Sequence, residues 1–210
     1  MVRPYSAPAR DDARRETRRR IRSEAAALFV RNGYVPTTLA AVAAASGVSG
    51  RYVQMVFGSK AGLLSEVIEV AVVGDDAEHP LAQRDDWAAM LEAGGEQTVG
   101  AFARIVASVY QRSAALLAVA AVAAETDPAL DALQTRSRER RLQDCTSMTD
   151  RLHDTGWLHP AVPPATAAVT VFALSSSELY LVFGKQLHVP HEHYAAWLAT
   201  TLIAVLPTGR

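Results

Sequence analysis

Apolar residues recur at a spacing of three and four positions along almost the whole chain, and this period restricts the fold to packed helices. In residues 13–32, for example, Ile21, Ala25, Leu28 and Phe29 fall on one helical face, while most of the arginines lie elsewhere. No stretch alternates apolar and polar residues between hairpin turns, as a half-buried strand would. The spacing therefore predicts an all-α protein.

Glycine, proline and polar clusters divide this pattern into separate helices. The clearest boundary is the polar segment 74–86, which contains Pro80. We expect a flexible basic arm over residues 1–14, a small head domain over 15–75 and a larger helical body over 76–210. The expected helices cover residues 13–32, 38–45, 50–56, 59–73, 87–93, 96–112, 113–124, 128–154, 164–186 and 191–206.

Charge is divided unevenly between the two parts of the chain. Residues 1–62 hold 11 Lys and Arg against 4 Asp and Glu, whereas residues 63–210 hold 10 against 18. A basic head and an acidic body indicate that the head meets a polyanion and the body does not.

The sequence favours a cytoplasmic protein. Cys145 is the only cysteine, so no intrachain disulfide can form, and we interpret it as a small helix residue. The arginine-rich N-terminus has no apolar stretch behind it, so we expect no signal peptide. The apolar run 114–124 is too short to span a bilayer, and 166–184 is interrupted at Ser175–Glu178. We therefore expect no membrane partner.

Two short helices at 38–45 and 50–56, joined by the tight turn Ser46-Gly47-Val48, predict a helix-turn-helix on the base of the first helix. Thr37 or Thr38 can cap the first of the two, and Ser49 the second. In such a motif one helix crosses the DNA backbone and the next enters the major groove.

This geometry predicts which side chains meet double-stranded DNA. Thr38 at a helix N-terminus suits a phosphate, and Lys60 at the start of the next helix can hold another. Arg51 can bond two acceptors of guanine, and Gln54 can pair with adenine.

Three further residues of the second short helix also face away from the core. Gly50 allows close backbone approach, and Met55 faces the base edges. Tyr52 either reaches a phosphate or thymine methyl, or packs on its own domain. The arginines of residues 14–22 are either close to DNA or a solvated helix face; we favour proximity to DNA because they adjoin the motif.

Residues 27–68 carry a set of features that together resemble the DNA-binding domain of TetR-type transcriptional regulators. The matching features are Leu28-Phe29, Gly33-Tyr34, Thr37-Thr38, Val42-Ala43, Gly47-Val48-Ser49, Phe57, Ser59-Lys60 and Leu63-Leu64. Residues 175–202 are also similar to the closing segment of many members.

The resemblance implies an all-helical homodimer whose heads bind a palindromic DNA operator and whose body binds a small-molecule effector that releases the DNA. Thr38 and Lys60 would contact phosphates. The recognition-helix contacts would be Ser49, Arg51, Tyr52 and Gln54.

Three positions depart from the family pattern. Most members have Tyr where this chain has Gln54, often His or Tyr where it has Val56, and commonly a basic residue where it has Ala40. Operator preference therefore cannot be transferred from the family. We hypothesise that the arginine-rich arm compensates by entering a minor groove or lying on phosphates.

Two alternatives remain open at this stage. The same head would suit an activator or a ligand-independent regulator. A helical small-molecule carrier whose head has lost DNA binding is also compatible with the departures at Gln54 and Val56.

In the body, large apolar residues are expected to form both a core and a ligand cavity. We expect Phe102, Val106, Tyr110 and Phe172 to line the cavity. Glu178, inside an apolar run, is either a paired structural carboxylate or a ligand contact.

The helices over 164–186 and 191–206 are strongly apolar and are expected to form a four-helix dimer interface. No metal site is expected from the histidines of 188–193, because three or four ligands must converge. Without a nucleophile elbow or a phosphate-binding glycine loop, we expect no catalytic residues, no cofactor and no enzyme.

Overall fold

The computed structural model describes residues 7–75 and 81–209, with side chains from residue 11 onward. Helix dominates both stretches. No described residue belongs to an extended strand, although Leu158 and Thr208 form an isolated antiparallel bridge. The prediction of an all-α protein is confirmed.

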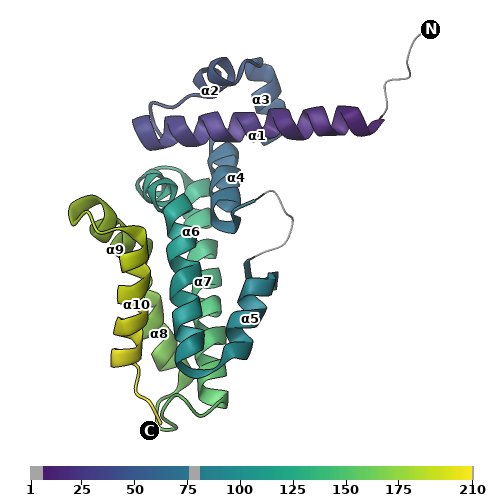
Figure 1. Cartoon of the computed structure of the whole chain (residues 1–210). Helices are drawn as coiled ribbons and strands as arrows, with labels where there is room; N and C mark the ends of the chain where they lie inside the picture. The colour runs from purple at the N-terminus through teal and green to yellow at the C-terminus, as the bar shows by residue number, and fades with distance from the viewer. Residues whose placement is uncertain (1–6, 76–80, 210) are drawn as a thin grey trace.

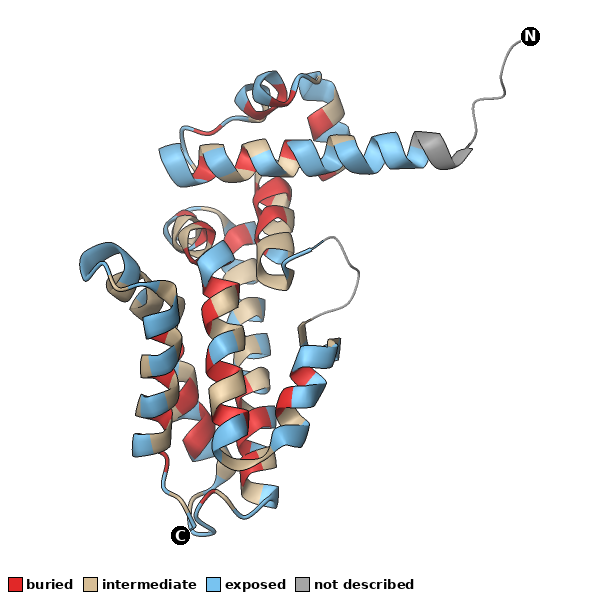
Figure 2. Ribbon diagram, in the orientation of Figure 1, coloured by how far each residue is buried: buried red, intermediate tan, exposed pale blue. Residues whose placement is uncertain are grey.

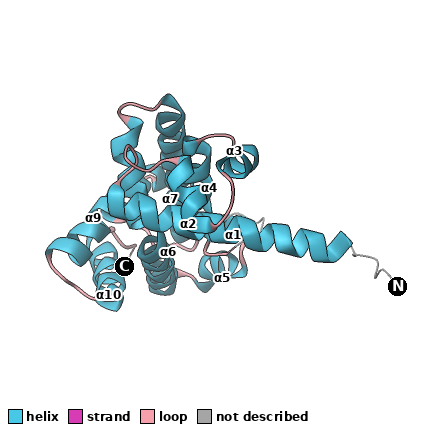
Figure 3. Cartoon of the chain, turned by 90° about the horizontal axis from the view of Figure 1, so that it is seen from above, coloured by secondary structure: helices cyan, strands magenta, loops and turns pink. Residues whose placement is uncertain are grey.

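The chain forms a small head that lies across one end of a longer helical body (Figure 1). The head consists of α1 (Ala7–Asn32), α2 (Leu39–Ser46), α3 (Gly50–Phe57) and α4 (Lys60–Val73). The body consists of η1 (Leu81–Gln83), α5 (Asp85–Ala93), α6 (Gly95–Ala124), α7 (Pro128–Asp154), α8 (Pro164–Leu174), α9 (Ser177–Leu181), the π-helical turn η2 (Val182–Gln186) and α10 (His191–Val205). Seen from above, α1 projects well beyond the body (Figure 3).

The head core is continuous with one end of the body. Ile21 and Phe29 of α1 are fully buried together with Val53 of α3. The same cluster includes Leu116 of α6 and Leu130 of α7. Figure 2 shows buried residues on α4 and on the adjoining end of the body. Burial at this junction removes apolar area from water on both sides, so the head is supported by the body.

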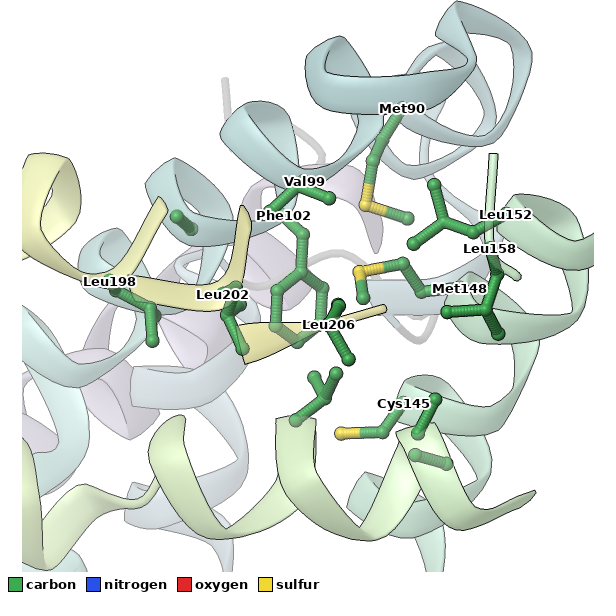
Figure 4. Close-up of a cluster of buried hydrophobic side chains, with 14 of the residues drawn as sticks. Met90, Val99, Phe102, Cys145, Met148, Leu152, Leu158, Leu198, Leu202 and Leu206 are labelled. Carbon is green, nitrogen blue, oxygen red and sulfur yellow. The ribbon is translucent and has the colours of Figure 1, made fainter. Parts of the chain in front are cut away.

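The body has its own core, formed by α5, α6, α7, α8 and α10. Phe102 of α6 lies at its centre, close to Met148 and Leu152 of α7 and to Leu198 and Leu202 of α10 (Figure 4). All five side chains are at most 2% exposed. Long helices of alternating direction bury these side chains against one another, as in helical bundles.

The first helix begins earlier than expected, because α1 starts at Ala7 and includes residues 7–14 of the expected arm. Pro8 lies in the first turn of α1, where its missing N–H costs no hydrogen bond, and nothing from residue 9 to 14 breaks a helix. The remainder of the expected arm, residues 1–6, lies outside the described part of the chain.

Two other helix predictions are corrected. Residues 96–112 and 113–124 belong to one helix, α6, because Ser113 does not break it and its hydroxyl donates to the Val109 carbonyl at 2.8 Å. The expected helix 164–186 is interrupted after Leu174. There the Ser176 hydroxyl accepts a bond from the Leu179 N–H at 3.2 Å and begins α9.

Within the described residues, Gly95–Ala124 and Pro164–Gln186 are long and apolar enough to pass a test for membrane spans. The first supplies buried residues to both cores, and the second is interrupted at Ser175. These two stretches therefore do not indicate a membrane protein.

Burial is expected to make Cys145 unreactive. Its side chain is fully buried, and burial raises the pKa of the thiol to about 11, although the nearby Arg141 charge opposes the shift. At pH 8 the thiolate is therefore a very small fraction. We expect a thiol reagent such as dithionitrobenzoate to modify native protein at least about 100-fold more slowly than urea-unfolded protein. Comparable rates would show that Cys145 is accessible.

Candidate functional site

The start of α2 is fixed by two neighbouring threonines with different roles. Thr38 is extended, and its hydroxyl accepts a bond from the Ala41 N–H at 3.0 Å, which makes Thr38 the N-cap. Thr37 is buried and donates to the Gly33 carbonyl at 2.8 Å. Thr38 is exposed, so its position beside the positive end of α2 is open to an anion.

The turn between α2 and α3 depends on Gly47, which adopts the left-handed conformation with φ of 65°. The Val48 N–H then bonds the Ala43 carbonyl at 3.0 Å. Ser49 caps α3 by accepting a bond from the Tyr52 N–H at 3.1 Å. These short-range bonds fix the direction of α3 relative to α2, as a helix-turn-helix requires.

The two faces of α3 differ sharply in burial. Val53 and Phe57 are buried in the head core. Arg51, Gln54 and Met55 are exposed, and their spacing of three and four places them on one face. Met55 is 69% exposed, so its apolar side chain is accessible to a thymine methyl.

The remaining predicted DNA contacts of α3 are placed less uniformly. Ser49 and Gly50 are exposed at its start. Tyr52 is half-buried and packs against the head core, so its ring supports the domain. The Gln54 side-chain amide donates to the Gly58 carbonyl at the end of α3, a bond it must give up to reach a base.

Lys60 has an intramolecular role that the sequence did not indicate. Its ammonium donates to the Tyr34 carbonyl at 2.9 Å and to the Val35 carbonyl at 3.2 Å. It also lies 4.1 Å from the centroid of the Tyr34 ring. Because an ammonium has three N–H donors, one remains for a phosphate. The phosphate contact of Lys60 stays a prediction.

Several α1 arginines connect the head helices to one another. Arg18 forms a two-point ion pair with Glu66 of α4, at 2.6 and 2.5 Å, and Arg22 bonds the same carboxylate at 3.2 Å. Arg20 donates to the Ser46 carbonyl at the end of α2, at 3.0 Å. At least three members of the cluster therefore stabilise the head. Sequence spacing could not reveal Glu66 as their partner, because it lies more than 40 positions away.

Comparison with known proteins agrees with this geometry. Residues 21–67 match the family model described as "Bacterial regulatory proteins, tetR family". The chain carries a TetR-family head. The match covers all of α2 and α3, the second half of α1 and the first half of α4. A search of curated proteins finds no match.

Solved structures share the fold of the whole chain, body included. One is a Rhodococcus sp. protein assigned to the TetR family, with a TM-score of 0.69, 16% identity, and coverage of 91% of this chain and 98% of that one. NalD from Pseudomonas aeruginosa, the secondary repressor of the MexAB-OprM multidrug efflux pump, matches with a TM-score of 0.61 and 22% identity. The match covers 92% of this chain and 97% of NalD. A Saccharomonospora viridis protein in complex with choline matches with a TM-score of 0.69 and 17% identity. That match covers 93% of this chain and 99% of the other.

The TetR-type head is joined to the body by a hydrogen bond as well as by the shared core. The Tyr34 hydroxyl donates to the Asp127 carboxylate at 2.7 Å, and the same carboxylate caps α7 through the Ala129 N–H at 3.0 Å. The Tyr34 bond is the main cause of the lowered pKa of Asp127. This bond thus connects the loop before α2 to the corner between α6 and α7.

Removal of this hydroxyl is expected to weaken the junction. Tyr34→Phe keeps the stacking on Phe29, whose ring centroid is 6.1 Å away, but loses the bond to Asp127. Because the site is partly exposed, we expect a loss of about 0.5–1.5 kcal/mol in unfolding free energy. Chemical denaturation at neutral pH measures it. In an Asp127→Ala background, which removes the acceptor, the same substitution should cost less; an equal cost would contradict the contact.

A second link connects the body to α4. Arg112 of α6 donates to the carbonyls of Ala71 and Val72, at 3.0 and 3.1 Å, and to the Ser108 hydroxyl at 2.7 Å. Its guanidinium therefore lies at the negative end of α4, where a cation is favourable. Gly74 has a φ of 96°, a backbone conformation that favours glycine.

A large cavity opens between α4, α5 and α6. Its volume is about 1030 Å³, at the upper end of the range for small-molecule sites. Trp87, Met90, Ile105 and Arg112 are among its lining residues. None of the five residues that we predicted as ligand contacts lines this cavity.

The five predicted ligand residues differ in their surroundings: one lies in the body core, three others are buried or half-buried, and one is exposed. Phe102 is 2% exposed and belongs to the body core. Val106 is half-buried, and Tyr110 and Phe172 both contact Arg141. Glu178 is exposed in the single chain, and its carboxylate accepts a bond from the Ser177 hydroxyl at 3.1 Å. Its role as a paired structural carboxylate or a ligand contact stays a prediction.

Proposed function

We propose that the protein is a homodimeric regulator of transcription that reads a palindromic operator with α3 and is released from it by a small molecule. The observation that carries the proposal is the exposed row of Arg51, Gln54 and Met55 on a capped, TetR-type recognition helix. A guanidinium, an amide and an apolar tip on one helical face supply partners for guanine, adenine and thymine.

Phosphate contacts would place this helix in the major groove. Thr38, Ser49 and the third N–H donor of Lys60 surround the starts of α2, α3 and α4. The N-terminal ends of these helices favour negative charge. The basic excess of the head adds a salt-dependent attraction to the DNA backbone.

An exposed face of α8 and α10 supports the homodimer. No residue of α8 is charged, yet Val169 is 61% exposed and Ala173 is also exposed. Ala196, Thr200 and Ala204 form an exposed row of small side chains on α10 at four-residue spacing. Pairing these helices with their symmetry mates buries an otherwise exposed apolar face in a four-helix interface. The two copies of α3 would then meet successive major grooves, about 34–36 Å apart.

Release by a ligand is supported by the fold and by its relatives. NalD, which shares the fold, is a repressor, and the Saccharomonospora viridis relative binds choline. In this chain, the bond from Arg112 to α4 and the bond from Tyr34 to Asp127 connect the body to the head. A ligand-induced shift of the body could therefore move the head through these contacts. A difference of about 1–3 kcal/mol in ligand affinity between DNA-bound and released forms is sufficient for such regulation.

The test begins with selection of bound sequences from random double-stranded DNA by the full-length protein. Fluorescence anisotropy then measures affinity for the selected sequence at several salt concentrations. We expect a palindromic site, nanomolar binding and a steep salt dependence. Failure to enrich any sequence, with no salt-sensitive binding, would instead favour a small-molecule carrier. A reporter assay with the gene deleted distinguishes repression from activation.

A further inference from the structure

A polar cluster lies in the body at the junction between α8 and α9. It contains the guanidinium of Arg141, which donates hydrogen bonds from only one of its nitrogens in the described residues. The Tyr110 hydroxyl of α6 donates to the Ser175 carbonyl at 2.8 Å. Arg141 of α7 donates from one nitrogen, Nη1, to the Tyr110 hydroxyl at 3.0 Å and to the Ser175 carbonyl at 3.4 Å. Three helices therefore converge on this one guanidinium.

The guanidinium of Arg141 is held in a fixed orientation. Its central carbon lies 3.6 Å from the centroid of the Phe172 ring, so the group is held above the ring while Nη1 is anchored at the edge. The Nε and Nη2 atoms make no hydrogen bond in the described residues. In arginines generally, the Nε–Nη2 edge of the guanidinium can bind a carboxylate through two parallel hydrogen bonds.

Arg141 also has no carboxylate partner among the described residues. Arg22 and Arg84 are paired with carboxylates, whereas Arg151, like Arg141, donates to a backbone carbonyl. In the described residues, no carboxylate lies within ion-pair distance of Arg141. Glu178 on α9 lies nearby but is exposed and accepts a bond from the Ser177 hydroxyl instead. A partly buried cation without a counter-ion favours binding of an anion.

Two buried hydroxyls accompany this cation. Both are inaccessible to solvent: the Tyr194 hydroxyl has no hydrogen-bond partner in the described residues, and the Ser175 hydroxyl has only the Cys145 thiol as a weak partner. Both residues are at most 1% exposed. A buried polar group without a partner is destabilising, so a bound acceptor at this position would be stabilising.

Aromatic rings extend from the cluster and supply an apolar surface. The Tyr180 ring lies 5.9 Å from that of Tyr110 and 4.9 Å from that of Tyr194. Phe183 and Trp197 continue the row, with centroids 4.4 Å apart. Charged recognition at one end and aromatic packing at the other suit an amphiphilic molecule.

We infer that Arg141 is the anchor of an effector site for organic anions, in which a carboxylate or similar head group meets the Nε–Nη2 edge and an apolar body lies among the aromatic rings. This inference rests on the proposed function, since it names the chemical class of the effector. Ser175 and Tyr194 would donate to the same head group. Occupation would bridge α6, α7, α8 and α10, and α6 carries the Arg112 link to the head.

The test uses three ligands that share one apolar chain: octanoate, octanol and octyltrimethylammonium. Calorimetric titration of the full-length protein without DNA is expected to show that octanoate binds at least about tenfold more tightly than the other two. Arg141→Met should reduce octanoate binding to that of octanol. Arg141→Lys, which keeps the charge but not the fork, should be intermediate. Arg138→Met, on an exposed position of the same helix, is the matched control and should leave the preference intact.

Equal binding of octanol, or tighter binding of the ammonium, would overturn the inference and favour the aromatic rings alone as the site. Retained octanoate preference in Arg141→Met would also overturn it, and would direct attention to the arginines of the cavity between α4, α5 and α6. Failure of all three ligands to bind would equally contradict the assigned class. Circular dichroism checks that each variant is folded. Because DNA is not present, failure of operator binding cannot affect these outcomes.

Discussion

Replacing Arg51 by Ala is expected to weaken operator binding by at least about 30-fold. The side chain is exposed on the outer face of α3 and makes no bond within the described head, so its loss does not disturb the core. A bidentate contact with guanine contributes about 1–3 kcal/mol. A homodimer presents the residue twice, so the combined loss is about 2–6 kcal/mol, or a factor of 30 or more. Anisotropy titration of the selected operator measures it.

The specificity of this loss is as informative as its size. Arg51→Ala should relax preference at one base pair in each half-site, whereas binding to non-specific DNA should change little. Arg138→Ala, which removes the same charge from the exposed surface of α7, is the matched control and should retain operator affinity. If both variants lose the same modest amount, Arg51 acts only through general charge and does not read a base.

Phe102→Ala is expected to destabilise the folded protein by about 3–5 kcal/mol, the range for truncation of a fully buried aromatic side chain. Phe102 is 2% exposed, and its ring packs edge-on against Trp87 with centroids 6.3 Å apart. Figure 4 shows it surrounded by side chains from α5, α6, α7 and α10. Urea unfolding at a fixed protein concentration measures the change, since a dimer makes stability concentration-dependent.

A more conservative variant separates packing from ligand binding. Phe102→Leu retains most of the apolar volume and should cost less than Phe102→Ala. If Phe102 instead lined a ligand cavity, as its sequence context suggested, truncation would leave stability within about 1 kcal/mol of the original and would alter ligand affinity. That result would show that the core position assigned to Phe102 is incorrect.

The head could be predicted from sequence because its determinants are local. Gly47 is required by a left-handed backbone, and Ser49 caps a helix that begins at the next residue. Val53 and Phe57 define the buried face of α3, which leaves Arg51 and Gln54 exposed. Each signal acts over one to four residues, the range within which the chain specifies its own turns and helices.

The partners of charged and polar groups could not be predicted in this way. Lys60 binds the carbonyls of Tyr34 and Val35, and Arg18 pairs with Glu66, across separations of 25 to 48 positions. A long side chain on an exposed-looking helix can reach DNA or a neighbouring helix, and only the packing of α1 against α4 decides between them. The same holds for Arg141, which has no local signature.

The sequence by itself determined an all-helical chain with a helix-turn-helix head, because the spacing of apolar residues and the caps at Thr38, Ser49 and Ser59 depend only on near neighbours. Only the tertiary structure decided which large apolar residues form the core, that α8 ends at Leu174 and a new helix follows, and that Arg141 has no carboxylate partner among the described residues. These outcomes depend on contacts between helices far apart in the chain, and a local pattern does not specify which helices meet.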